Sequence, residues 1–176
     1  MGMGRWSLSV TGVATLREYR LGWLRPDVIG GFHLLVNGCY APGELQFEDV
    51  RFEMLQRLFS GTHTQELAMS GLAASTMMAA TGLPPYIYTT NNARRVSSNP
   101  AVYARNLLAN RIYQCPVLYY EPYVMNQEET YRRLLVGHYI GRTLLQDHLI
   151  SSPMEDYARG VVRGLVAYYA ETRHAK

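Results

Sequence analysis

The sequence predicts an α/β layer fold, because short strand-like segments alternate with longer helix-like ones. Phe32–Val36 and Pro116–Tyr120 are apolar runs rich in β-branched and aromatic residues, as is typical of strands buried on both faces in a parallel or mixed sheet. Ser152–Glu171 carries apolar residues three or four positions apart, which is the spacing of a helix that docks by one face. A length of 176 residues suits one domain, residues 1–176, with a sizeable core.

Composition and charge exclude several classes of protein. Hydrophobic residues make up 48% and charged residues 18% of the chain, which indicates a globular rather than a disordered protein. A net charge of +3 is too weak to indicate a nucleic-acid partner. The first residues lack the apolar core of a signal peptide, and no stretch approaches a membrane span. We therefore expect a cytoplasmic protein with no nucleic-acid and no membrane partner.

The amino-terminal part is predicted to contain a strand, a helix and a second strand. Trp6–Val13 alternates loosely as an edge strand does, and Ala14–Leu24 has the pattern of a short helix. Phe32–Val36 follows as a buried strand. His33 lies within it, and a lone histidine in an apolar strand is more often a core residue than a ligand.

The next segment is ambiguous, and the one after it is clear. Ala41–Phe59 reads as a ragged strand or as the lip of a groove. Thr62 and Gln65 have the spacing of a capping box, which predicts a helix that begins there and ends at Gly82. Small alanine side chains should let this helix lie close against the sheet.

The segments around residue 100 are predicted to continue the alternation. Tyr86–Thr89 is a third strand candidate, and Asn91–Ser98 is a polar, basic loop. Asn99 is suited to cap a helix over Pro100–Arg111. The two cysteines, Cys39 and Cys115, lie at opposite ends of the sheet if their strands run parallel, so both are expected to be free thiols.

The last third of the chain is predicted to hold two helices separated by a loop. Asn126 caps the first of them, which ends at Gly137, and His138–Ile150 is read as a loop. Ser152 caps the final helix, and Pro153 takes its first position. Four apolar residues are expected to dock this helix on the sheet: Tyr157, Val161, Leu165 and Tyr168.

Glu121 is the most suggestive single residue. It directly follows the apolar strand Pro116–Tyr120, and Pro122 ends the strand behind it. A carboxylate at the end of a buried strand is costly unless it has a partner or a function, and sites in open α/β sheets gather beyond the carboxyl ends of strands. We therefore expect Glu121 to face a cleft; the alternative is a solvated residue at the end of a strand.

Residues from about 31 to 169 resemble the carboxyl-terminal part of a known enzyme family. The matching segments are FHLLVNGCYAPGE, TQELA, ATGLP, YARNLLANR, CPVLYYEPYVMN and DYARGVVRGLVAYY. They look like the zinc-dependent N-acetylmuramoyl-L-alanine amidases of the cell wall, also called type 3 amidases. The resemblance implies a mixed, largely parallel sheet flanked by helices on both faces, without the first strand and helix of the family fold.

The same resemblance implies a peptidoglycan substrate and a role for Glu121. The family hydrolyses the bond between the muramic acid lactyl group and L-alanine, with zinc held by two histidines and a glutamate. Glu121 falls on the second glutamate, which activates the metal-bound water. Asn37 occupies the place of the last histidine ligand, so no metal ligand is assigned and we expect little or no zinc binding.

Three interpretations follow from this departure. The chain is an active amidase whose zinc is held by stand-in ligands, among them His33, Cys39 or Glu44. Alternatively, it is an inactive or regulatory module that binds muropeptides without zinc. In the third interpretation it is a shortened form of a longer protein whose missing part supplied the metal site. A sheet that lacks its first strand would also expose an edge or a face, which favours self-association.

The expected groove combines residues from the ends of neighbouring strands. The resemblance places Asn37 and Glu121 at such ends, so they should converge on one cleft that binds peptidoglycan fragments. Asn126 and Arg105 are expected to contribute to substrate binding, with Arg94 or Arg95 also placed near the rim. The alternative is that Asn126 is only a helix cap and that the arginines form a solvated face.

Overall fold

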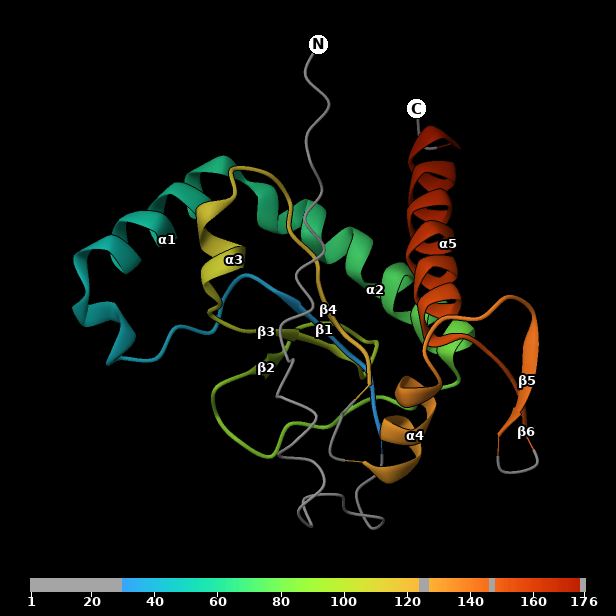
Figure 1. Cartoon of the computed structure of the whole chain (residues 1–176). Coiled ribbons are helices and arrows are strands. Elements are labelled where there is room, and N and C mark those ends of the chain that lie inside the picture. Colours follow the sequence, from blue (N-terminus) through green and yellow to red (C-terminus); the bar gives the residue numbers. More distant parts are fainter. Residues whose placement is uncertain (1–29, 124–126, 146–147, 175–176) are drawn as a thin grey trace.

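The computed structural model describes residues 30–123, 127–145 and 148–174. These residues form five α-helices, a short 3-10 helix, a four-stranded sheet and a separate two-stranded hairpin, which confirms the predicted α/β class (Figure 1). The predicted strand Trp6–Val13 and helix Ala14–Leu24 lie outside the described residues. Among the described helices, none has the length and apolar character that crossing a membrane requires.

The sheet is mixed, and its strands follow the order β2-β3-β1-β4. Their bounds are Arg94–Arg95 for β2, Val102–Ala104 for β3, His33–Val36 for β1 and Tyr119–Glu121 for β4. Only β1 and β3 run parallel, whereas β1 with β4 and β2 with β3 are antiparallel. The prediction of a largely parallel sheet is therefore wrong.

Strand β3 lies within the segment Pro100–Arg111 that was predicted to be a helix. Its residues are buried beside β1, with Val102 opposite Leu34. Asn99 caps a turn instead of a helix, because its Oδ1 accepts a hydrogen bond from the Ala101 amide at 3.0 Å. Burial of β-branched and aromatic side chains in the sheet has outweighed local helix propensity, and only α3 (Leu108–Ile112) is helical.

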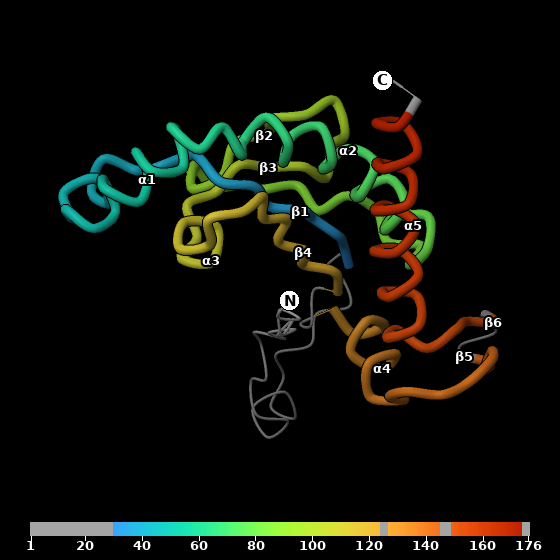
Figure 2. Tube along the Cα trace, turned by 90° about the horizontal axis from the view of Figure 1, so that it is seen from above, coloured from blue at the N-terminus to red at the C-terminus, as the bar shows by residue number. Residues whose placement is uncertain are grey.

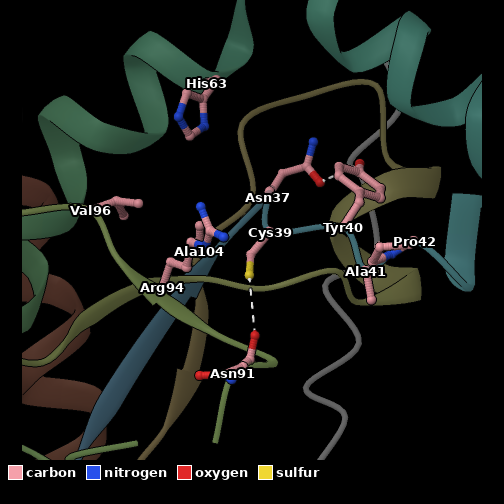
Figure 3. A pocket seen from close by; sticks show the side chains of 11 residues that line it. Asn37, Cys39, Tyr40, Ala41, Pro42, His63, Asn91, Arg94, Val96 and Ala104 are labelled. Carbon is pink, nitrogen blue, oxygen red and sulfur yellow. Dashed lines mark hydrogen bonds between the residues drawn. The ribbon is translucent and has the colours of Figure 1, made fainter.

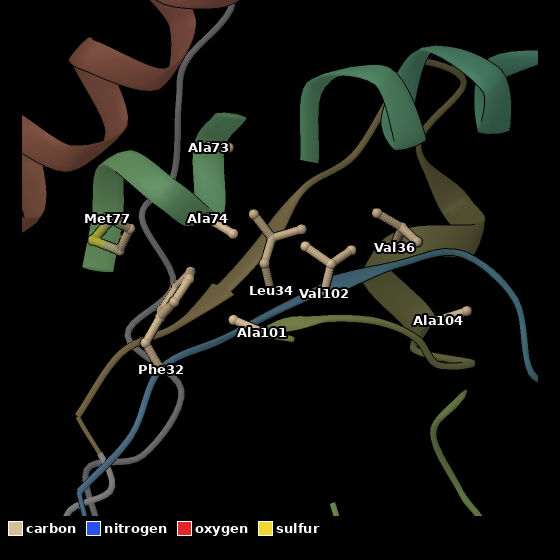
Figure 4. Close-up of a cluster of buried hydrophobic side chains, with 9 residues drawn as sticks. All are labelled: Phe32, Leu34, Val36, Ala73, Ala74, Met77, Ala101, Val102 and Ala104. Atoms are coloured by element: carbon tan, nitrogen blue, oxygen red, sulfur yellow. The ribbon is translucent and has the colours of Figure 1, made fainter. Parts of the chain in front are cut away.

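Helix α2 (Thr62–Thr81) covers one face of the sheet and makes the main core with it (Figures 1 and 4). The core side chains are Phe32, Leu34, Val36, Ala73, Ala74, Met77, Ala101, Val102 and Ala104. Ala73 and Ala74 are fully buried, and their small size lets the helix backbone approach the strands closely. The predicted close packing of this helix on the sheet is confirmed.

The opposite face of the sheet carries a smaller apolar cluster. Leu35 and Tyr103 lie at its centre, together with Ala93. Tyr88, Leu107 and Tyr119 pack around them, and none of these residues belongs to a described helix. The prediction of helices on both faces is therefore wrong for the described part of the chain.

Strand β4 lies at an edge of the described sheet and not at its centre. All three of its residues are only half-buried. Tyr120 packs toward the main core and Tyr119 toward the smaller cluster, so this strand contributes an aromatic ring to each face of the sheet. The prediction of a strand buried on both faces is wrong here, and self-association through a sheet edge stays a prediction.

The ambiguous segment Ala41–Phe59 is mainly helical, so the prediction of a strand there is wrong. A 3-10 helix at Glu44–Gln46 leads into α1 (Glu48–Ser60), whose first turn is acidic and complements the helix dipole. Gly61, at φ 67°, ends α1 and serves as the N-cap of α2, so the capping box predicted at Thr62 does not form. The predicted end of α2 before Gly82 is confirmed.

A buried ion pair joins the corner between α1 and α2 to the segment that leads into β4. The side chains of Arg57 and Glu66 contact each other, and they are 2% and 0% exposed. Arg57 Nη1 donates to the carbonyls of Tyr113 and Cys115 at 2.9 and 2.7 Å. Glu66 Oε1 accepts a hydrogen bond from the Val117 amide at 2.8 Å. The pair thereby fixes where the chain approaches the sheet.

Helix α4 (Glu128–Val136) and a hairpin follow β4. The cap of α4 is Gln127, whose side chain accepts from the Thr130 amide at 2.6 Å, while the predicted cap Asn126 lies outside the described residues. The hairpin pairs β5 (Arg142–Leu145) with β6 (His148–Ser151), so the prediction of a loop over residues 138–150 is wrong.

Helix α5 (Pro153–His174) packs against α2 and stands beside it in both views (Figures 1 and 2). Its predicted cap is confirmed, because Ser152 Oγ accepts from the Glu155 amide at 3.2 Å. Gly160 and Gly164 face α2, and Thr76 Oγ1 donates to the Gly160 carbonyl at 2.9 Å. Tyr157 and Val161 reach the core, but Leu165 does not. The prediction that α5 docks on the sheet through Leu165 is wrong.

Leu165→Ala is expected to lower the unfolding free energy by only about 1 kcal/mol or less, because its side chain is 38% exposed. The matched variant Leu34→Ala removes a fully buried leucine and should cost about 2–5 kcal/mol. Chemical denaturation of both variants tests this difference. An equal cost at the two positions would contradict the packing of α5 described above.

Candidate functional site

Glu121 lies at the carboxyl end of β4, directly opposite His33 at the amino end of β1. The carboxylate Oε2 is hydrogen-bonded to His33 Nε2. The His33 side chain is 8% exposed, whereas that of Glu121 is 37% exposed. Glu121 is therefore anchored to the sheet by a buried imidazole while part of its carboxylate faces solvent.

Tyr88 and Arg105 extend this contact into a chain of four polar side chains, here named the Glu121 cluster. The Tyr88 hydroxyl lies 2.9 Å from His33 Nε2. Arg105 Nη1 donates to the same hydroxyl at 3.4 Å, and its guanidinium lies 6.0 Å from the centre of the Tyr88 ring. The Glu121 cluster thus runs from Glu121 through His33 and Tyr88 to Arg105.

The surroundings of Glu121 favour its ionised form. The hydrogen bond from His33 lowers the pKa of Glu121, and the charges of His33 and Arg105 act in the same direction against the opposing effect of burial. Burial raises the pKa of Tyr88, so its hydroxyl stays protonated. At neutral pH the site therefore presents a carboxylate, which requires the hydrogen on His33 Nε2.

This arrangement determines what each side chain can do. The one hydrogen on His33 Nε2 is donated to Glu121, with the Tyr88 oxygen close beside it, while Nδ1 is buried and has no partner among the described residues, so His33 positions Glu121. The Oε1 atom of Glu121 makes no hydrogen bond to the described residues. Glu121 can therefore accept a hydrogen bond from a ligand or take a proton from it, and Arg105 can donate to a ligand nearby.

Asn37 lies at the other end of β1, so it does not share a cleft with Glu121 as expected. The two side chains would converge only if β4 ran parallel to β1, and β4 is antiparallel. Asn37 is about 13 Å along the strand from His33, the partner of Glu121. It is 8% exposed, and its Oδ1 accepts a hydrogen bond from the Tyr40 hydroxyl at 2.8 Å.

Asn37 instead lines a separate pocket at the carboxyl ends of β1 and β3, with a volume of about 700 Å³ (Figure 3). Its walls come from the turn after β1, the start of α2 and the region around β2. The lining residues are Asn37, Gly38, Cys39, Tyr40, Ala41, Pro42, His63, Asn91, Arg94, Val96 and Ala104. We name this the strand-end pocket.

The proposed stand-in ligands for zinc do not gather in one place. His33 and Cys39 flank opposite ends of β1, and Glu44 is engaged locally, since its Oε2 accepts from the Ala41 amide at 2.7 Å. Within the described ranges, no three or more His, Cys, Asp or Glu side chains are arranged to hold a metal ion. These residues therefore do not fit a zinc site, and whether the chain binds zinc stays a prediction.

Sequence reasoning singled out Glu121 and Arg105, and the structure brings both into one cluster. The sequence analysis missed Tyr88 and the pairing of His33 with Glu121. The one sequence signal for Tyr88 was the tyrosine-rich segment 86–88. Asn126 lies outside the described residues, and both cysteines are free thiols as predicted.

In comparisons with known proteins, no family model, no curated protein and no solved structure matches the chain. The resemblance to amidases therefore rests on the sequence segments alone.

Proposed function

We propose that this chain recognises peptidoglycan fragments and binds the amide that joins the muramic acid lactyl group to L-alanine at the Glu121 cluster. One observation carries the proposal: an ionised, partly exposed carboxylate is held in place by a buried histidine. The carboxylate of Glu121 has an oxygen available for a ligand. Of the three interpretations, binding without hydrolysis requires the fewest residues beyond those of the Glu121 cluster.

The chemistry of the cluster complements an amide. An amide offers an N–H donor and a carbonyl acceptor, and the cluster offers a carboxylate acceptor in Glu121 and a guanidinium donor in Arg105. Hydrogen bonds to charged groups are about twice as strong as those between neutral groups. The rings of Tyr86 and Tyr88, whose centres lie 5.1 and 5.0 Å from that of His33, add aromatic surface suited to a sugar or peptide.

The resemblance to the amidases supports the same ligand, because it assigns Glu121 to the position of the family's proton-transferring glutamate. It also supports a second candidate function, hydrolysis of the bound amide. Glu121 is ionised and can take up a proton as a general base, although its lowered pKa makes it a weaker base than an ordinary glutamate. We assign no step to zinc, and the assays below are run with and without added zinc.

Glu121→Ala is expected to weaken the binding of muramyl dipeptide, which contains the lactyl–alanine amide, by about 10-fold or more, as loss of a charged hydrogen-bond partner does. Titration calorimetry on the full chain measures the affinity, and chromatography of the mixture measures cleavage. Since protonation removes the acceptor and the pKa of Glu121 is lowered, binding should persist through the ordinary glutamate range and fall only at more acidic pH.

Two controls make the result specific to the Glu121 cluster. Glu171→Ala removes a carboxylate from the exposed surface of α5 and should leave the affinity unchanged. N-acetylmuramic acid, which lacks the peptide, should bind more weakly than muramyl dipeptide. Cleavage that disappears in Glu121→Ala would replace the binding role with hydrolysis. An unchanged affinity in Glu121→Ala, or no binding at millimolar ligand, would refute the proposal.

A further inference from the structure

We propose that the strand-end pocket is a second binding site, independent of the Glu121 cluster, for a small molecule that carries a carboxylate or phosphate group. Its volume of about 700 Å³ falls within the range of about 300–1,000 Å³ that small-molecule sites occupy. It lies at the carboxyl ends of the parallel strands β1 and β3, where ligands bind in open α/β sheets. No member of the Glu121 cluster lines it.

The charge of the described lining favours an anion. Arg94 is exposed and its guanidinium makes no ion pair or side-chain hydrogen bond with the described residues, so it is available to a ligand. No aspartate or glutamate is among the lining residues. An arginine can hold a carboxylate or phosphate through two parallel hydrogen bonds. Arg94 is therefore the expected anchor for the negative group.

Asn37 and Tyr40 supply a fixed neutral donor beside this charge. Burial raises the pKa of Tyr40, which keeps its hydroxyl protonated and able to donate to Asn37 Oδ1 at 2.8 Å. This bond leaves the amide nitrogen of Asn37 with two N–H groups, and the nitrogen is directed away from Tyr40 (Figure 3). A buried, oriented amide donor is well suited to one oxygen of the anion.

The wall formed by α2 adds to the positive character of the pocket. His63 lies in the first turn of this helix, whose amino-terminal end carries a positive partial charge. The nearby carboxylate of Glu66 lies 3.7 Å from His63 Nδ1, but it is 0% exposed and already paired with Arg57. Its charge is therefore compensated and does not face a ligand in the pocket.

Cys39 makes occupancy measurable. It lines the pocket at φ 53°, and its Sγ points to the carbonyl of Asn91 at 3.9 Å (Figure 3). In a Cys115→Ser background it is the single thiol, and iodoacetamide is a neutral reagent that Arg94 does not attract. The experiment follows alkylation of Cys39 in the full chain while inorganic phosphate or, separately, glutarate is added at constant ionic strength set with sodium chloride.

At least one of the two anions is expected to slow alkylation saturably, by about 10-fold at ten times its Kd. Arg94→Gln should raise that Kd by about 10- to 100-fold, as loss of a charged hydrogen bond does. Arg163→Gln removes the same charge from the exposed surface of α5 and should leave Kd unchanged.

The pattern of protection identifies the ligand chemistry. Protection by phosphate alone supports a phosphate-bearing ligand, protection by glutarate alone a carboxylate-bearing one, and protection by both an anion site that accepts either group. The proposal is overturned if neither anion slows alkylation beyond chloride. It is also overturned if Arg94→Gln leaves Kd unchanged, or if Arg163→Gln raises Kd equally, since that would show a general effect of surface charge.

Discussion

Glu66→Ala is expected to cost about 3–5 kcal/mol of unfolding free energy, the largest loss we predict for a single residue. The variant leaves Arg57 buried with its charge uncompensated, and it also removes the acceptor of the Val117 amide. Stability of a whole domain is only about 5–15 kcal/mol, so the variant should unfold at a much lower concentration of denaturant.

Arg132→Ala provides the comparison for this variant. It breaks the exposed ion pair between Arg132 and Glu128 within α4, and such pairs contribute about 0–1 kcal/mol. Denaturation by urea, monitored by circular dichroism, measures both changes. If Glu66→Ala were no more harmful than Arg132→Ala, the ion pair would not connect the α1–α2 corner to the segment before β4.

Gly164→Val is expected to cost about 1–3 kcal/mol or more by forcing α5 away from α2. A Cβ added at Gly164 would lie 2.9 Å from Ala73 Cα and 2.9 Å from Thr76 Oγ1. The first of these atoms belongs to the backbone of α2, which can yield only if the whole helix shifts. The cost should appear as a lower midpoint in thermal unfolding.

Gly71→Ala tests whether the effect comes from crowding. Gly71 lies within α2, where an added Cβ would meet only Ser97 Oγ at 3.9 Å, an ordinary contact. Alanine is a better helix former than glycine by about 1 kcal/mol, so this variant should be stabilised. Destabilisation by both variants would mean that the separation of α2 and α5 does not explain the requirement for Gly164.

The helices with strong local signals could be predicted from the sequence, and most strands could not. Ser152 and Pro153 mark the start of α5, and Gly82 marks the end of α2, because caps act within a few neighbouring residues. Val102–Ala104 was assigned to a helix because its strand character arises only from pairing with β1. The hairpin β5–β6 was assigned to a loop for the same reason, since its strands mainly support each other.

The candidate site was half predictable. Glu121 stood out because a charged residue follows an apolar run, which is a local feature. Its partner His33 depends on the direction of β4, and the expectation of a parallel strand placed Glu121 beside Asn37 instead. Only the tyrosine-rich segment 86–88 pointed to Tyr88, because this segment forms no strand and reaches the cluster only through tertiary packing.

The central position of β1 has a consequence for the kinetics of folding. Its two edges pair with β3 and β4. His33 in β1 is 88 residues away in the sequence from its hydrogen-bonding partner, Glu121 in β4. Closing such long loops costs chain entropy before any contact compensates for it, which slows folding relative to helical proteins of similar size. During synthesis β1 emerges before β3 and β4 and must wait for both partners. Its apolar side chains are exposed throughout that interval, when they are open to wrong pairing with other chains.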